Sequence, residues 1–144
     1  HTAYRRQRQM CIRDRCDDVV MNLLEDELDT DLVWVGSWEP PQEVVDQFIA
    51  VAIVTDNGYN TIDETRWATV EIEVEAETRA NAKKLAAEIS SLLNELPGET
   101  VRGILVDDVA ENEGPRMVGD IDRSKRVYAM VYSLAFRKQL VEGD

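Results

Sequence analysis

Polar and hydrophobic residues alternate most regularly in the segment WATVEIEVEAE, from Trp67 to Glu77. Successive side chains of a β-strand point to opposite faces of a sheet, so this alternation predicts a strand with one apolar and one acidic face. The apolar face is expected to belong to the core. The acidic face carries Glu71, Glu73 and Glu75, which we call the acidic ladder.

Two segments instead repeat hydrophobic residues at intervals of three and four, which is the spacing of an amphipathic helix. The first runs from Asp17 to Leu28. The second runs to about Glu95 and begins after Thr78, a residue type that favours the N-terminus of a helix. A Pro-Gly pair follows and is expected to end it.

The other hydrophobic segments have the β-branched and aromatic content of strands. These strands are expected at residues 32–38, 48–55, 101–109 and 126–138. Asp56-Asn57-Gly58 predicts a tight turn after the second of them. The polar stretch 110–125 is interrupted by glycines and a proline, and it is expected to be a mobile loop.

The resulting order, α-β-β-β-α-β-β, predicts one α+β domain over residues 16–144, with a mainly antiparallel sheet of about five strands packed by two helices. The last strand is apolar on both faces, and helices can cover only one of them in a domain of this size. We therefore expect the subunit to associate with other chains. The residues assigned to subunit or partner contacts are Tyr128, Met130, Tyr132, Leu134, Phe136, Arg116, Arg123 and Arg126.

Residues 1–15, HTAYRRQRQMCIRDR, are basic in an otherwise acidic chain. One interpretation is an arm whose arginines pair with phosphates while Tyr4 stacks on a base. The other is that the segment is not native. RRQRQMCIRD is the translation of CGT CGG CAG CGT CAG ATG TGT ATA AGA GAC, which resembles sequencing-adapter DNA. We favour the second interpretation, exclude the segment from the domain and expect it to be disordered.

Excluding these residues removes five arginines and one aspartate, so the formal net charge changes from −13 to −17. Such an acidic chain is unlike a general nucleic-acid binder, because Lys and Arg supply most of the affinity for phosphate. No hydrophobic segment approaches the roughly 20 residues that cross a bilayer. We expect no specific DNA binding and no membrane association.

The exclusion also removes the single histidine, His1, and leaves Cys16 as the only thiol. Catalytic triads, Cys–His pairs and the usual zinc sites are therefore excluded. Paired acids at 107–108 and at 120 and 122 have no recognisable Arg, Lys or His beside them for acid–base catalysis. We predict a protein that is not an enzyme and that has no cofactor and no metal.

The acidic ladder has two interpretations of its own. Carboxylates suit hard divalent cations, but residues two apart on a strand are about 7 Å apart, which is too far for one ion. A solvated face is the simpler interpretation.

Four segments carry a resemblance to a known family: DDVVMNLLEDEL, FIAVAIVTDNG, VEIEVEAETRANAKKLAAEISSLL and RVYAMVYSLAFR. Together they resemble the tail terminator proteins of long-tailed bacteriophages, also called tail completion or minor tail proteins, over nearly all of residues 17–138. Two features depart from the family pattern. The turn has the single Gly58 where many relatives carry two glycines, and Pro40-Pro41 precedes an extra QEVVDQ stretch.

The resemblance implies a virion protein, assembled in the bacterial cytoplasm, that forms a homo-oligomeric ring, usually of six subunits. Such a ring caps the head-proximal end of the tail tube, stops its polymerisation and joins it to the head connector. Its partners would be the major tail tube protein and the head-completion proteins. If the acidic ladder lines the channel, it would keep passing DNA from adhering. The alternatives are another neck protein, such as a head-completion or stopper protein, and a small ferredoxin-like ligand-binding oligomer.

Overall fold

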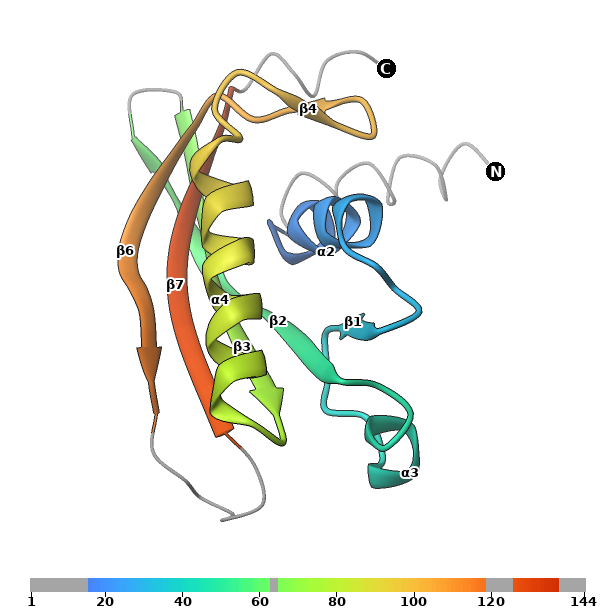
Figure 1. The fold of residues 1–144 in the computed structure, drawn as a ribbon. Helices are drawn as coiled ribbons and strands as arrows, with labels where there is room; N and C mark the ends of the chain where they lie inside the picture. The colour runs from blue at the N-terminus through green and yellow to red at the C-terminus, as the bar shows by residue number, and fades with distance from the viewer. Residues whose placement is uncertain (1–15, 63–64, 119–125, 138–144) are drawn as a thin grey trace.

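The computed structural model describes residues 16–62, 65–118 and 126–137 (Figure 1). Its centre is a five-stranded sheet in the order β1-β2-β3-β7-β6. The strands of this sheet are β1 (Val33–Gly36), β2 (Ala50–Ile62), β3 (Thr65–Ala76), β6 (Asp108–Met117) and β7 (Arg126–Arg137). The other elements are the helices α2 (Cys16–Glu27), α3 (Gln42–Val45) and α4 (Arg79–Asn94), and a hairpin of β4 (Thr100–Val101) and β5 (Ile104–Leu105).

The α+β class and the mainly antiparallel sheet are confirmed. Neighbouring strands of the sheet pair antiparallel except β1 and β2, which are parallel. Helix α2 packs over β1 and β2, whereas α4 packs over β3, β7 and β6 (Figure 1). Both helices cover the same face of the sheet, which we call the helix-covered side, and neither of them covers the other face.

Strand β3 occupies the centre of the sheet and carries the alternation read from the sequence. The side chains of its apolar face are buried under the helices: Ala68, Val70, Ile72, Val74 and Ala76. Helix α4 supplies the facing stripe, in which Leu85, Ile89 and Leu93 are buried. Burial of one such leucine or isoleucine side chain is worth about 1.5–3 kcal/mol, so this contact is a main source of stability.

Helix α4 begins where the sequence predicted, directly after Thr78. Thr78 is the N-cap, and its Oγ1 accepts a hydrogen bond of 3.2 Å from the backbone N–H of Asn81. This bond satisfies one of the amide groups that have no partner within the helix. The cap therefore fixes the point at which the chain leaves β3 and enters α4.

The tight turn predicted at 56–58 is wrong, because β2 continues through these residues to Ile62. The pairing with β3 shifts between Asp56 and Tyr59, which is a β-bulge. Gly58 has a φ of 100°, and its N–H donates a hydrogen bond of 3.1 Å to Oδ1 of Asp56. The Asp-Asn-Gly sequence does bend the backbone, but it forms a bulge inside one strand instead of a turn between two strands.

The single strand predicted at 101–109 is also wrong, because Arg102 and Gly103 turn the chain between β4 and β5, both with positive φ. The loop predicted at 110–125 begins as strand β6, which runs to Met117. Its polar sequence conceals a strand because it lies at the edge of the sheet and exposes most of its side chains. Residues 119–125 lie outside the described residues.

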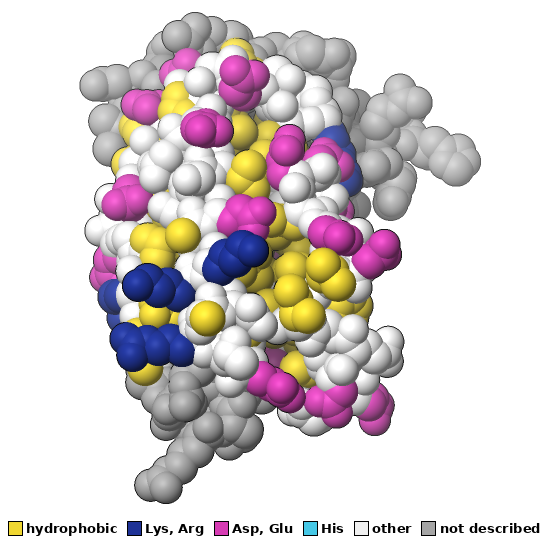
Figure 2. Space-filling view, in the orientation of Figure 1, with side chains coloured by type: hydrophobic (Ala, Val, Ile, Leu, Met, Phe, Trp, Pro, Cys, Tyr) yellow, Lys and Arg dark blue, Asp and Glu magenta, His cyan; other side chains and the backbone are white. Residues whose placement is uncertain are grey.

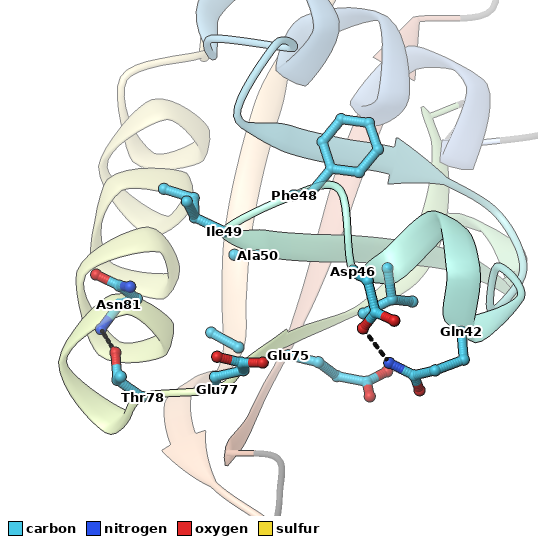
Figure 3. Close-up of a pocket in the computed structure, with 11 residues that line it drawn as sticks. Gln42, Asp46, Phe48, Ile49, Ala50, Glu75, Glu77, Thr78 and Asn81 are labelled. Carbon is cyan, nitrogen blue, oxygen red and sulfur yellow. Dashed lines mark hydrogen bonds between the residues drawn. The ribbon is translucent and has the colours of Figure 1, made fainter.

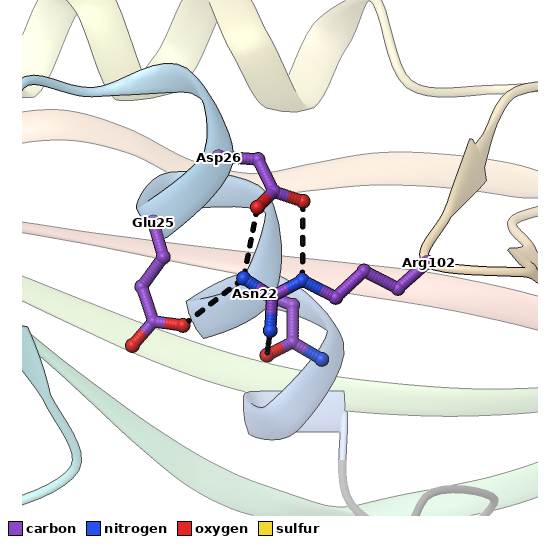
Figure 4. Close-up of polar contacts among 4 residues, drawn as sticks. All are labelled: Asn22, Glu25, Asp26 and Arg102. Carbon is purple, nitrogen blue, oxygen red and sulfur yellow. Dashed lines mark hydrogen bonds and ion pairs between the residues drawn. The ribbon is translucent and has the colours of Figure 1, made fainter.

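Arg102 fastens the β4–β5 hairpin to α2 (Figure 4). Its guanidinium donates hydrogen bonds to both carboxylate oxygens of Asp26, at 2.8 and 3.2 Å, and to Oδ1 of Asn22 at 2.9 Å. A further contact of 3.3 Å reaches Oε1 of Glu25. The hydrogen bonds from Arg102 hold the pKa of Asp26 below its ordinary value.

Candidate interaction surfaces

The residues of β7 assigned to subunit contacts do not form a surface. The side chains of Tyr128, Met130, Tyr132, Leu134 and Phe136 are buried in the core under the helices. The assignment is therefore wrong for these five residues, because they share the face that packs on α2 and α4. A strand that is apolar on both sides does not reveal from sequence alone which side the helices cover.

The arginines assigned to contacts have different positions. Arg116 lies on β6 and forms an exposed ion pair with Glu113, with a distance of 2.8 Å between Nη2 and Oε2. Arg126 is the first residue of β7, and Arg123 lies outside the described residues.

Neither α2 nor α4 covers the second face of the sheet, and we call it the open face. Residues that pair across neighbouring strands share a face, so the register identifies its members. On β1, β2, β3 and β7 they are Trp34, Gly36, Val51, Ile53, Thr55, Trp67, Thr69, Glu71, Glu73, Glu75, Val127, Ala129, Val131, Ser133 and Ala135.

The acidic ladder runs along the middle of the open face. Glu73 pairs with Ile53 on one side and with Ala129 on the other, so its carboxylate lies between apolar columns. Glu71 and Glu73 are half-buried, and Glu75 is buried, with 9% of its surface exposed. Burial, followed by repulsion from Glu71 and Glu39, raises the pKa of Glu73. The ladder is thus less solvated than a free acidic surface.

Two tryptophans stand at the β1 end of the open face. The rings of Trp34 and Trp38 pack edge to face, with centroids 5.5 Å apart and an interplanar angle of 71°. The ring of Trp34 also lies over Gly36, where an added Cβ would come within 2.2 Å of it. Trp38 remains 59% exposed. A large aromatic group is therefore presented to solvent at the β1 edge of the open face.

The helix-covered side carries a small cluster of positive charge among acidic side chains. Arg79, Lys83 and Lys84 are exposed on the first turns of α4, and we call them the cationic patch (Figure 2). None of the three forms an ion pair within the described ranges, whereas Arg102 and Arg116 both do. The patch therefore offers positive charge that no carboxylate pairs within the described part of the chain.

An apolar groove of about 230 Å³ lies next to the cationic patch. Leu28, Leu32, Val33, Ile49 and Leu85 line it, and Lys84 and Glu88 stand on its α4 side. Leu32 and Ile49 remain 46% and 50% exposed. Figure 2 shows hydrophobic side chains gathered on this side of the molecule, close to the Lys and Arg side chains.

A second hollow, of about 350 Å³, lies between α3 and the start of α4 (Figure 3). Its polar groups are partly engaged already: Nε2 of Gln42 donates a hydrogen bond of 2.8 Å to Oδ1 of Asp46, and Thr78 caps α4. No lysine, arginine, histidine or cysteine is among its described lining residues. The hollow therefore lacks a set of converging groups suited to catalysis or to binding an anion.

The described residues also bear on metal binding and on membrane insertion. Within 16–62, 65–118 and 126–137, no group of three His, Cys, Asp or Glu side chains is placed to hold a metal ion. None of the helices described there is long and apolar enough to span a bilayer. The features that stand out are surfaces: the open face, the cationic patch and the apolar groove.

Comparison with known proteins gives a similarity in fold. No family model matches the chain, and no curated protein matches it. A chain of the solved structure described as "Virion of native gene transfer agent (GTA) particle" superimposes with a TM-score of 0.58 at 15% sequence identity. The alignment covers 85% of this chain and 94% of that chain. The fold of that virion chain is therefore present here over nearly its whole length.

Proposed function

We propose that this protein is a structural component of a phage-like virion and that it acts as the tail terminator. The observation that carries the proposal is the fold shared with a chain of the gene transfer agent virion, over 94% of that chain. The sequence resemblance to tail terminators supports the finer assignment. In this role, copies of the subunit form a ring on the head-proximal end of the tail tube.

The mechanism is steric and relies on surfaces instead of catalysis. One side of the ring docks on the last tube subunits, and the other side offers them no further docking surface, so polymerisation stops. That other side then joins the head connector. The net charge of −17 for residues 16–144 keeps passing DNA from adhering, because phosphate is repelled by an acidic wall.

Removing the gene from the phage or gene-transfer-agent genome that carries it tests this role. We expect tail tubes of uncontrolled length that do not join heads, as measured by electron microscopy of lysates. Expression of residues 16–144 in trans should restore both tail length and joining. Tails of normal length on unjoined, leaking heads would instead indicate a head-completion or stopper protein, and normal particles would contradict both roles.

A further inference from the structure

We propose that the cationic patch and apolar groove of one subunit dock on the open face of the next copy, where the lysines meet the acidic ladder. This inference rests on the proposed ring, and it names the two surfaces that form it. The partner is a second copy of the same chain, because one subunit carries both complementary surfaces.

The positions of the two surfaces set the symmetry of the contact. The exposed side of α4 points away from the sheet, so the cationic patch and the acidic ladder lie on opposite sides of the subunit. A contact between them is therefore head-to-tail. Interfaces of this kind join different patches of neighbouring copies, and they produce a ring when the rotation closes.

Charge complementarity is the main argument for the pairing. Arg79, Lys83 and Lys84 have no ion-pair partner within the described part of the subunit, and neither do Glu71 and Glu73. Charges left unpaired on opposite sides of one chain would be satisfied together in a head-to-tail assembly. Complementary charges of this kind chiefly set the register and the choice of partner.

The spacing of the charges also agrees. Ladder residues two apart on β3 are separated by about 7 Å. Arg79 and Lys83 are one helical turn apart, which is about 5–6 Å. A helix laid along the strand can thus place successive cations against successive carboxylates. The raised pKa of Glu73 also agrees with this pairing. Burial and repulsion from other carboxylates raise that pKa, and a cation of the next subunit would stabilise the ionised carboxylate.

Apolar residues accompany the charges on both sides. Leu32 and Ile49 are half exposed beside the cationic patch, and Trp38 is exposed at the β1 edge of the open face. Val127 and Val131 add partly exposed apolar area to the open face. Apolar and aromatic side chains of this size form the centre of stable interfaces, where they exclude water from the adjacent ion pairs.

Charge reversal tests the pairing in the full chain. One variant carries Glu71→Lys and Glu73→Lys, and the other carries Lys83→Glu and Lys84→Glu. We expect each reversal alone to raise the subunit concentration needed for assembly at least tenfold, as measured by sedimentation velocity in about 50 mM NaCl, where charges are weakly screened. Mixing the two variants should restore assembly, because each then presents the charge that the other needs.

The control variant carries Glu95→Lys and Glu99→Lys, which gives the same charge change on exposed residues after α4. It should assemble like the unchanged chain, and circular dichroism checks that every variant is folded. Assembly that tolerates both reversals, as expected if the ladder lines the channel, would overturn the pairing and leave the terminator role standing. So would a mixture that stays dissociated. An unchanged chain that remains monomeric at every concentration would overturn the ring and the pairing together.

Discussion

The hydroxyl of Tyr132 on β7 donates a hydrogen bond of 2.7 Å to Oε1 of Glu111 on the edge strand β6. Ser90 of α4 bonds the same hydroxyl, and Nδ2 of Asn94 donates a bond of 3.2 Å to the same carboxylate oxygen. Burial raises the pKa of Tyr132 to about 12. These hydrogen bonds, chiefly the one from Tyr132, lower the pKa of Glu111. Two strands and a helix are thus joined at one point.

Replacing this tyrosine, Tyr132→Phe, should lower the free energy of unfolding by about 1–2 kcal/mol in urea titrations, since it removes a hydrogen bond to a carboxylate and another to Ser90. The pKa of Glu111 should rise toward its ordinary value in NMR titrations. A lowered folded-state pKa of Glu111 stabilises the fold at neutral pH, and this stabilisation is lost as the pH falls through that pKa. The difference in unfolding free energy between the variant and the wild type should therefore become smaller in acid. An unmoved pKa of Glu111 would contradict the assignment.

Glu73→Gln should stabilise the monomer at neutral pH. The folded-state pKa of Glu73 is raised, so its ionised form costs stability above that pKa, and the cost disappears as pH falls below the ordinary value near 4.5. The variant should therefore show a higher urea midpoint at pH 7 and the wild-type midpoint in acid. Glu99→Gln, at an exposed site, is the matched control and should show neither change.

Gly36→Ala should disturb the tryptophan pair. The new Cβ would lie 2.2 Å from Cη2 of Trp34, so the ring must shift, and its contact with Trp38 should change. We expect a loss of about 1–3 kcal/mol, together with altered tryptophan fluorescence and near-UV circular dichroism. Gly58→Ala is the control for the steric contact. Gly58 has a φ of 100°, so alanine is strained there, but no atom lies within 4 Å of the added Cβ. It should destabilise the fold without a spectral change.

Arg102→Ala should release the β4–β5 hairpin from α2. The lost ion pairs are exposed, so the decrease in stability should be small, and about 1 M NaCl should largely remove it. The pKa of Asp26 should return toward its ordinary value, since the hydrogen bond from Arg102 lowers it. Hydrogen exchange should report faster opening of residues 100–105. Wild-type exchange at these residues would show that the hairpin is held by its apolar contacts.

Deleting residues 1–15 tests the proposal that they are not part of the native protein. The free energy of unfolding should change by less than about 0.5 kcal/mol, and assembly should be unaffected. A longer deletion through Val20 is the control. It removes Cys16, Val19 and Val20, which are buried in the core, and it should prevent stable folding.

Regular patterns made parts of this fold predictable. The alternation around Glu73 and the helical spacing after Thr78 define a strand and a helix because one face of each is buried and the other is not. Strand β6 could not be predicted from the sequence, because an edge strand with exposed side chains has little apolar alternation. The contact face of β7 was misassigned because residues such as Tyr132 and Ala135 are apolar on opposite faces, and only the position of α4 decides between them.

The irregular edge of β6 also limits how copies of this protein can meet. Its pairing with β7 shifts twice, and Pro115 has no N–H to offer a further strand. At the opposite edge, β1 pairs over only four residues. Neither border is a good template for extending the sheet, so we expect the copies of the proposed ring to meet through their faces. Faces can close a ring of fixed size, whereas a long open strand border would invite growth without an end point.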